Sequence, residues 1–158
     1  RNRYSAAETT TTSMSWRDIR PVAVGVARRD DEVLLCRLRD EEADETFYRP
    51  IGGAVEFGEL SDEALVREFR EELSVEISDY DHLETLENTF VFQGTEGHEI
   101  WFLYEVAFAE DWPYERDEFE GREPELGETY PAVWKPVDEL SEDIVYPENL
   151  AALVRTHG

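Results

Sequence analysis

The chain has 158 residues, with 39 acidic side chains against 15 Lys and Arg and a formal net charge of −24 at pH 7. Its length fits one domain with a real core, and eight Phe, seven Tyr and four Trp argue against wholesale disorder. The lack of a basic patch argues against tight binding of a nucleic-acid duplex, and no apolar run reaches membrane-spanning or secretory-signal length.

The basic residues are fourteen Arg and one Lys, Lys135. In ordinary salt such a chain repels itself, whereas in molar salt the Debye length falls to about 3 Å. The composition therefore indicates a protein of a salt-accumulating halophile, with the cytoplasm as its default location. A protein that mimics or binds polycations is the alternative, although the acids are spread over the whole chain.

Residues 1–15 are rich in Ser, Thr and Ala and are expected to form a flexible tail before a single domain over residues 16–158. Met14 is the only Met, which leaves open whether the natural chain begins there. Apolar runs at 22–27 and 33–38 predict two strands joined by a polar hairpin turn. Cys36, in the second run, is expected to be a buried core residue, with a catalytic thiol as the alternative. An acidic loop is expected at 40–46.

Residues 53–76 read GAVEFGELSDEALVREFREELSVE and predict a loop followed by a helix. Ser61 is a suitable N-cap, and the acids after it suit the first turn, where the helix dipole favours negative charge. Leu65, Phe69 and Leu73 recur at i, i+4 and i+8 and predict a buried stripe. A carboxylate face beside this stripe would lie at the boundary between the core and a cleft.

That face carries Glu68, Glu71 and Glu72, at i, i+3 and i+4. These positions are neighbours on a helix, and clustered acids are unfavourable without a compensating cation. Mg²⁺ is a suitable cation because it takes oxygen ligands. A solvated acidic helix face is the alternative for this cluster taken alone.

Further along, residues 87–92 and 98–108 predict two strands around a long hairpin at 93–97, and the apolar run 100–104 predicts a central strand. Residues 109–130 are expected to be a long acidic loop of the kind that is often functional. A short strand at 132–137 and a closing helix at 147–156 complete the prediction.

The stretch from residue 53 resembles the Nudix box of the Nudix hydrolase family: Gly, any five, Glu, any seven, Arg-Glu, apolar, any, Glu-Glu, any, Gly, apolar. One position departs, because Ser74 stands where the family has the Gly that ends the helix. The matching residues are Gly53, Glu59, Arg67, Glu68, Phe69, Glu71, Glu72 and Val75.

The resemblance implies an α/β Nudix fold, with a curved mixed β-sheet between α-helices and the box as a loop-helix-loop. It also implies a hydrolase of phosphoanhydride bonds. Such an enzyme cleaves a nucleoside diphosphate linked to another moiety by water attack on phosphorus, with Mg²⁺, or else Mn²⁺, as cofactor. The expected partner is a small-molecule phosphoanhydride, and a homodimer is possible.

Carried over to this chain, the resemblance implies roles for single residues. Glu68 and Glu72 correspond to the principal metal ligands, Glu71 to a further ligand or the holder of a metal-bound water, and the Gly52 carbonyl to a backbone ligand. Glu59 and Arg67 correspond to the salt bridge that ties the loop to the helix. Glu56 is a supporting residue or a ligand, with a solvated loop acid as the alternative.

The catalytic base of this family often lies outside the box. Glu99 is the candidate here, because a charge entering an apolar strand is costly unless it is paired. An exposed acid at a hairpin end is the alternative. Competing candidates lie in the predicted acidic loop, namely Glu115, Glu118 and Glu120.

Other side chains are candidates for substrate contacts. Arg49 could bind phosphate with two donors, or form a surface ion pair instead. Trp112 or Tyr114 could stack on a base or simply pack, and His98 is expected to be a polar hairpin residue rather than a ligand.

Two other functions are alternatives. A non-catalytic nucleotide-sensing module is one, although such modules often lose acids that this chain retains. A diphosphate isomerase on the same fold is the other, and it would need an additional reactive Cys or acid near the site.

Overall fold

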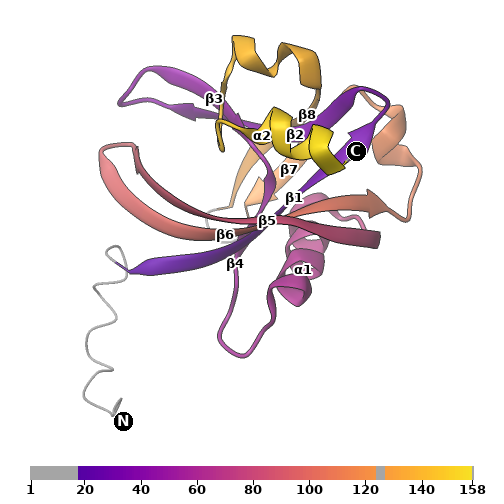
Figure 1. The fold of residues 1–158 in the computed structure, drawn as a ribbon, viewed down its shortest axis with the longest axis horizontal. Coiled ribbons are helices and arrows are strands. Elements are labelled where there is room, and N and C mark those ends of the chain that lie inside the picture. The colour runs from indigo at the N-terminus through magenta and orange to yellow at the C-terminus, as the bar shows by residue number, and fades with distance from the viewer. Residues whose placement is uncertain (1–17, 124–126, 158) are drawn as a thin grey trace.

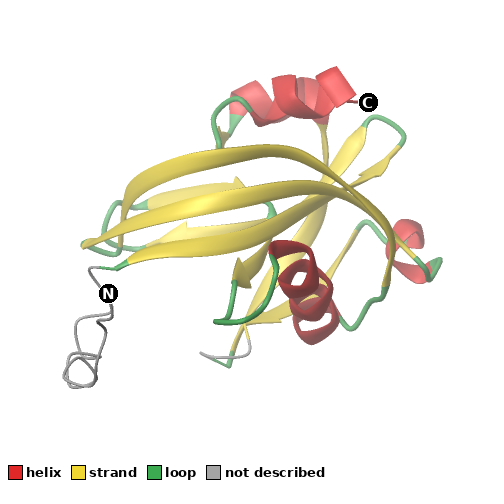
Figure 2. Ribbon diagram, turned by 60° about the horizontal axis from the view of Figure 1, so that its bottom comes forward, coloured by secondary structure: helices red, strands yellow, loops and turns green. Residues whose placement is uncertain are grey.

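The computed structural model describes residues 18–123 and 127–157, so the predicted tail over residues 1–15 lies outside the described residues. Two groups of strands form one curved, mixed sheet (Figures 1 and 2). The first group, in spatial order, is β5 (Ile77–Phe92), β6 (Thr95–Phe108), β1 (Ile19–Arg29) and β4 (Ile51–Ala54). The second is β9 (Ile144–Val145), β3 (Glu45–Arg49), β2 (Glu32–Asp40), β8 (Glu128–Pro136) and β7 (Glu118–Glu123).

The turn between β1 and β2 joins the two groups. Strands β1 and β2 pair only next to this turn, Arg28 with Val33 and Arg29 with Glu32, and diverge beyond it. Their central residues are buried, as expected for strands covered on both faces. β1 runs parallel to β6 and β9 parallel to β3, whereas the other strand pairs are antiparallel.

Helices α1 (Ser61–Leu73) and α2 (Leu150–His157) cover opposite faces of the sheet (Figure 2). Helix α1 packs on β1, β4 and β7, while α2 packs near β5 and the short helix η3 (Val137–Glu142). Each helix has its own buried cluster, with Phe69 in one and Leu150 in the other. In the part of the chain that the structure describes, no helix is both long and apolar enough to cross a bilayer.

The run at 100–104 lies in a central strand, as predicted, because β6 is flanked by β1 and β5. The predicted hairpin is present, but its five-residue loop at 93–97 is wrong: the turn is Gln93-Gly94, both with positive φ, and the second strand begins at Thr95 instead of residue 98. The first strand begins at Ile77 instead of residue 87. Polar residues at this end of the hairpin gave no apolar alternation from which the longer strands could be predicted.

Three other boundaries are also corrected. The predicted loop at 109–130 contains a short helix, η2 (Trp112–Glu115), and all of β7. The acidic loop predicted at 40–46 shrinks to a turn between β2 and β3, and the closing helix begins at Leu150 instead of residue 147. The first two errors lie where charged residues occupy the exposed face of a strand and hide its period.

Candidate active site

Helix α1 begins one residue earlier than predicted. Leu60 is the N-cap and Ser61 the first helical residue. The Ser61 hydroxyl lies 2.6 Å from the Tyr104 hydroxyl instead of capping the helix. Glu63 Oε1 accepts a hydrogen bond from the Leu60 N–H at 2.8 Å and so satisfies one of the free donors at this helix end.

The helix ends at Ser74, the residue that departs from the box. Ser74 adopts the left-handed conformation, with φ 59° and ψ 38°, and its N–H donates to the Arg70 carbonyl at 3.1 Å. The departure therefore leaves the helix end in the geometry that glycine adopts most easily.

The buried side of α1 brings carboxylates to the edge of the core. Leu65, Phe69 and Leu73 are buried, as the stripe predicted. Glu68 and Glu72 flank the stripe and are only 8% and 5% exposed. A solvated acidic face therefore does not describe these two residues.

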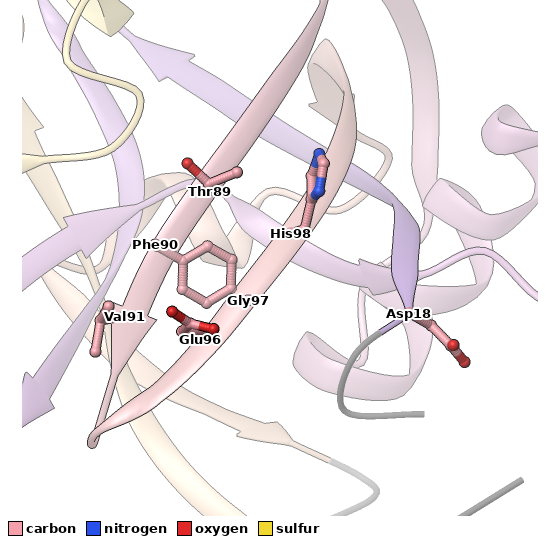
Figure 3. Close-up of a pocket in the computed structure, with 7 residues that line it drawn as sticks. All are labelled: Asp18, Thr89, Phe90, Val91, Glu96, Gly97 and His98. Carbon is pink, nitrogen blue, oxygen red and sulfur yellow. The ribbon is translucent and has the colours of Figure 1, made fainter. Parts of the chain in front are cut away.

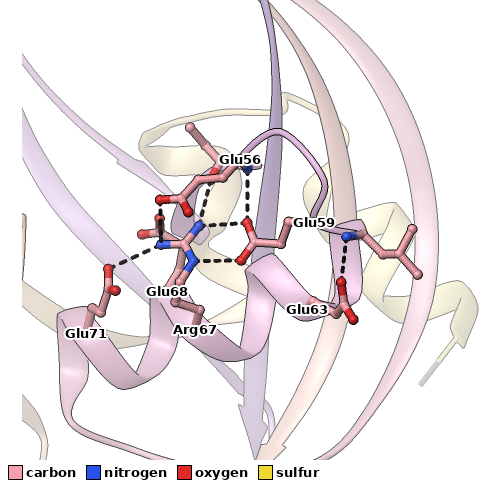
Figure 4. Close-up of polar contacts among 8 residues, drawn as sticks. Glu56, Glu59, Glu63, Arg67, Glu68 and Glu71 are labelled. Atoms are coloured by element: carbon pink, nitrogen blue, oxygen red, sulfur yellow. Dashed lines mark hydrogen bonds and ion pairs between the residues drawn. The ribbon is translucent and has the colours of Figure 1, made fainter.

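Arg67 is the hub of the box (Figure 4). Its Nε and Nη2 donate to Glu59 Oε2 and Oε1 at 2.7 and 3.0 Å, a two-point contact between helix and loop. Its Nη1 donates to Glu68 Oε2 at 2.9 Å and to Glu71 Oε1 at 3.2 Å, and its Nη2 donates to the Ala54 carbonyl at 3.0 Å. These hydrogen bonds to Arg67 lower the pKa of Glu59.

Glu56 completes the loop. Its backbone N–H donates to Glu59 Oε1 at 3.0 Å, and its carboxylate lies 3.8 Å from Arg67 Nη1. The side chain of Glu56 is largely exposed. Glu56 thus reaches the site from its rim.

Glu72 is the most desolvated acid of the helix. The Tyr130 hydroxyl donates to its Oε1 at 2.6 Å. Its Oε2 is buried and has no hydrogen-bond partner among the described residues. Burial and the neighbouring Glu68 carboxyl raise the pKa of Glu72 above its usual range. A cation at this point would satisfy the orphaned oxygen and offset both effects.

Two glycines make room for this arrangement. A Cβ on Gly53 would lie 2.5 Å from Glu68 Oε1. A Cβ on Gly52 would lie 2.0 Å from the Ala23 carbonyl oxygen. Neither position accepts a side chain without moving backbone or the Glu68 carboxylate.

Several of these groups line a small pocket of about 150 Å³, which we call the carboxylate pocket, whereas Gly52, Glu59 and Glu72 do not line it. Within the described ranges, no three His, Cys, Asp or Glu side chains are arranged to hold a metal ion, and Arg67 Nη1 lies between Glu68 and Glu71. The donor type nevertheless fits a hard divalent cation, since the pocket is rich in carboxylates and the orphaned Oε2 of Glu72 belongs to a side chain next to Glu68, one of the lining residues. The lining residues are Arg20, Gly53, Ala54, Glu56, Arg67, Glu68, Glu71 and Glu123.

Glu123 was missed by sequence reasoning. It lies in β7, and its proximity contributes to the raised pKa of Glu72. The predicted base candidates in this segment, Glu115, Glu118 and Glu120, are exposed and do not line the pocket. The sequence could have indicated its inward direction. Alternate residues of a strand face the same side, and Glu123 alternates with two buried residues, Phe119 and Gly121.

A second, larger cavity of about 420 Å³ lies between the β5–β6 hairpin and the β2–β3 hairpin; we call it the aromatic cavity. It contains both Glu99 and Arg49, and it shares Arg20 with the carboxylate pocket. Its lining residues are Arg20, Leu38, Asp40, Glu45, Phe47, Arg49, Asn88, Thr89, Phe90, Val91, Phe92, Glu99, Trp101 and Tyr146.

Glu99 is 6% exposed and is not the exposed hairpin acid of the alternative interpretation. Its Oε1 accepts from Trp101 Nε1 at 2.8 Å, and its Oε2 lies 3.6 Å from Arg20 Nη1. Arg49 places its guanidinium 4.8 Å from the centre of a Trp101 ring and donates to the Pro50 carbonyl at 3.3 Å. Neither Glu99 nor Arg49 lines the carboxylate pocket.

His98 lies in a shallow hollow of about 470 Å³ on the β5–β6 hairpin (Figure 3). The Phe90 ring packs over Gly97 there, where a Cβ would come within 2.2 Å of the ring. The hollow also holds Asp18 and Glu96, acids that disfavour an anionic ligand. His98 does not line the carboxylate pocket.

Trp112 and Tyr114 are packing residues. Trp112 meets Phe119 edge to face at 5.0 Å between ring centres. Tyr114 stacks on Trp134 at 5.9 Å, and its hydroxyl accepts from the Phe108 N–H at 2.9 Å. Neither ring lines the aromatic cavity.

Cys36 is a buried core residue. Its thiol donates to the Arg49 carbonyl at 3.4 Å, and desolvation raises its pKa to about 12. The reactive form of a cysteine is the thiolate, so this residue is poorly suited to nucleophilic chemistry.

Comparison with known proteins agrees with the box. The family model described as NUDIX domain matches residues 19–154. No curated protein sequence matches the chain significantly.

Several solved structures share the fold. The crystal structure of a MutT NUDIX hydrolase from Burkholderia pseudomallei has a TM-score of 0.61 and 24% identity, covering 85% of this chain and 96% of that one. A NUDIX-family hydrolase from Clostridium perfringens has a TM-score of 0.59 and 20% identity, covering 88% and 95%. An ADP compounds hydrolase has a TM-score of 0.59 and 22% identity, covering 87% and 72%. With the family match over most of the chain, these findings place the protein in the Nudix family, as a hydrolase of phosphoanhydride bonds.

Proposed function

We propose that this Nudix hydrolase is a divalent-metal-dependent pyrophosphohydrolase whose substrate is a nucleoside diphosphate linked to another moiety. The substrate could be a nucleotide, a nucleotide sugar or a dinucleoside polyphosphate. The observation that carries the proposal is Glu72 Oε2, a buried carboxylate oxygen without a hydrogen-bond partner among the described residues. A buried charge of this kind is costly unless it is paired, and Mg²⁺, or else Mn²⁺, is the partner that carboxylates suit.

Glu68 and Glu72 would hold the ion, with Glu71 and the Gly52 carbonyl as further ligands. When bound, the ion would neutralise the diphosphate, polarise the phosphoryl centre and help to form the attacking hydroxide. Tyr130 fixes the orientation of Glu72 by donating to its Oε1, and Arg67 holds Glu68 and Glu71 in place from the other side. Such supporting contacts position ligands and tune them.

Glu71 and Glu123 are candidates for taking the proton of the attacking water. Both line the carboxylate pocket, and the Glu71 side chain is 44% exposed, so water can reach it. The sequence also proposed Glu99 as a base. Its place in the aromatic cavity supports the different role argued below.

The two other functions find less support. An isomerase with a reactive thiol does not agree with the buried Cys36. A sensing module does not need a buried, incompletely bonded Glu72, and the chain retains every acid of the box. We further propose that the enzyme works in the cytoplasm of a salt-accumulating cell, as its charge of −24 suggests.

The test is a substrate screen in molar KCl with 10 mM Mg²⁺. Nucleoside diphosphates linked to sugars, phosphates or a second nucleoside are incubated with the full chain, and the products are separated and quantified. We expect hydrolysis of at least one substrate and its loss in EDTA, with recovery on addition of Mg²⁺ or Mn²⁺. Full activity in EDTA would refute the metal requirement. Failure to cleave any phosphoanhydride would refute the proposed function.

A further inference from the structure

We infer that the aromatic cavity binds the base of the nucleotide substrate and that Glu99 selects the base through its N–H donors. The inference rests on the proposed function and adds to it a base preference. It also gives Glu99 a role in recognition instead of proton transfer.

The walls of the cavity suit a flat aromatic ring. Phe47 meets Phe92 and Tyr146 edge to face, at 5.9 and 5.6 Å between ring centres. Phe90 and Trp101 also line the cavity. Bases stack on aromatic side chains whatever their sequence, so these walls supply affinity with little selectivity.

A buried carboxylate holds the two hairpins around the cavity together. Asp40 Oδ1 accepts from the Ala43 N–H at 3.1 Å, in the turn between β2 and β3. Asp40 Oδ2 accepts from the Gln93 N–H at 3.2 Å, in the turn between β5 and β6. Both oxygens of Asp40 are therefore engaged, and the cavity is a built feature rather than a gap between loose loops.

Glu99 differs from Asp40 because one of its oxygens retains acceptor capacity. Oε1 is occupied by Trp101 Nε1, whereas Oε2 lies 3.6 Å from Arg20 Nη1, longer than a hydrogen bond. Glu99 is nearly buried and lines the cavity, so a ligand that donates to Oε2 would offset part of its desolvation. An ionised carboxylate only accepts hydrogen bonds.

The number of N–H donors that each base presents to a carboxylate predicts the order of binding affinity. Guanine presents two adjacent N–H groups, N1–H and N2–H, on one edge. Adenine and cytosine present one amino group each. Uracil presents one N–H between two carbonyl oxygens, which a carboxylate repels. We therefore expect guanine to bind best and uracil worst.

Arg20 explains how one substrate can occupy both sites. It lines the aromatic cavity and the carboxylate pocket, and its side chain is 50% exposed. A guanidinium at this junction suits the phosphates that would connect a base in one cavity to the scissile bond in the other.

The first experiment measures binding without turnover. GMP, AMP, UMP and the base-free ribose 5-phosphate are titrated into the full chain by calorimetry, in molar KCl and EDTA. We expect GMP to bind on the order of 10-fold or more tighter than UMP, since a hydrogen bond to a buried charge can make such a difference. Ribose 5-phosphate should bind weakest.

The second experiment compares Glu99→Gln with Glu87→Gln, a matched control on the same hairpin that is exposed and does not line the cavity. Glutamine retains an oxygen that can accept from Trp101 and adds a donor. Glu99→Gln should therefore weaken GMP binding on the order of 10-fold or more and narrow or reverse the preference over UMP. Binding of ribose 5-phosphate should be unchanged, and Glu87→Gln should behave as wild type.

Kinetics with the guanine and uracil forms of a cleaved substrate then separate recognition from catalysis. Recognition predicts a higher KM for the guanine form with kcat within about threefold of wild type. An equal fall in kcat for both bases would show that Glu99 is a base catalyst and would overturn the inference. Equal affinity of the wild type for GMP, UMP and ribose 5-phosphate would also overturn the inference. If the enzyme still hydrolysed a phosphoanhydride, the proposed function would stand. If no phosphoanhydride is cleaved, the proposed function fails, and the binding titrations still decide whether the cavity takes a base.

Discussion

The environment of Glu72 makes it the residue whose loss should be most informative. Its Oε1 is held by Tyr130, whereas its Oε2 is left for a ligand. Glu72→Gln retains the shape of the side chain and removes the charge. We expect turnover to fall on the order of 10²-fold or more, because metal binding and transition-state stabilisation weaken together. Glu68→Gln should act in the same way.

A thermal melt distinguishes loss of the ion from loss of the fold. Mg²⁺ at 10 mM should raise the melting temperature of the wild type, because a ligand that binds only the folded state stabilises it. The rise should be absent in Glu72→Gln and retained in Glu118→Gln, which changes an exposed acid outside the pocket. Rates within about threefold of wild type for both box variants would show that the ligand assignment is wrong.

Ser74 is predicted to be a site where stability can be gained. A residue with a Cβ pays a penalty in the left-handed conformation, whereas glycine does not. Glycine also gives the unfolded chain more freedom, which offsets part of the gain. Ser74→Gly should therefore raise the free energy of unfolding by about 0.5–1 kcal/mol, measured by urea denaturation. Ser74→Ala keeps the Cβ and should show no such gain.

Cys36 should be inert in the folded protein. Burial raises its pKa to about 12, so the reactive thiolate is scarce at neutral pH. Below that pKa, each increase of one pH unit raises the thiolate fraction about tenfold. Alkylation by iodoacetamide at pH 8 should be slow for the native chain and rapid in urea, as followed by mass spectrometry. Fast native labelling would reopen the isomerase alternative, which needs a reactive group near the site.

At the scale of elements, Arg67 joins α1 to the loop that precedes it. Arg67→Ala would leave Glu59, Glu68 and Glu71 without the cation that now separates them. We expect a loss of about 2 kcal/mol in the free energy of unfolding, within the range for broken hydrogen bonds to charged groups. Arg67→Lys should recover little of it, because lysine cannot make the two-point contact with Glu59.

Limited proteolysis reports on the loop directly. Phe57 is fully exposed in the loop before α1 and offers a site for chymotrypsin. Cleavage there should be faster in Arg67→Ala than in the wild type or in Arg155→Ala, which removes an exposed arginine paired with Asp138. Unchanged cleavage would mean that Arg67 does not restrain the loop.

The elements that the sequence predicted well are those whose burial leaves a period. The stripe of Leu65, Phe69 and Leu73 predicted the buried face of α1, and the apolar run at 100–104 predicted a central strand. β7 was hidden, because its outward positions are charged and only Phe119 is a large inward residue. The role of Glu123 was lost with it.

The assembly of the aromatic cavity could not be predicted, for a different reason. The Nudix box fixes spacings within one helix and loop, whereas the aromatic cavity is assembled from hairpins far apart in the sequence. Its two buried acids show this, since Asp40 accepts from the Gln93 N–H and Glu99 approaches Arg20. Such pairings depend on strand register and cannot be read from local composition.

For the whole molecule, the balance of charges predicts a strong dependence on salt. Attractive pairs exist, such as Arg29 with Glu32 and Arg70 with Glu76, and salt weakens them. Exposed pairs contribute little, however, and 39 acids against 15 Lys and Arg leave repulsion as the larger effect. Screening should therefore stabilise the folded chain on balance.

We expect the melting temperature to rise on the order of 10 °C between 0.1 M and 2 M KCl. About 1 kcal/mol shifts the melting temperature of a domain of this size by 2–4 °C, so this rise corresponds to about 2.5–5 kcal/mol of added stability. Screening changes most at low concentration, where the Debye length falls from about 10 Å at 0.1 M to about 3 Å at 1 M. Most of the rise should therefore occur below 1 M, with NaCl and KCl equivalent and sucrose of matched osmolality less effective. A midpoint that does not move between low and molar salt would contradict the halophile interpretation. A rise that sucrose reproduces in full would assign the effect to solute exclusion instead of to charge.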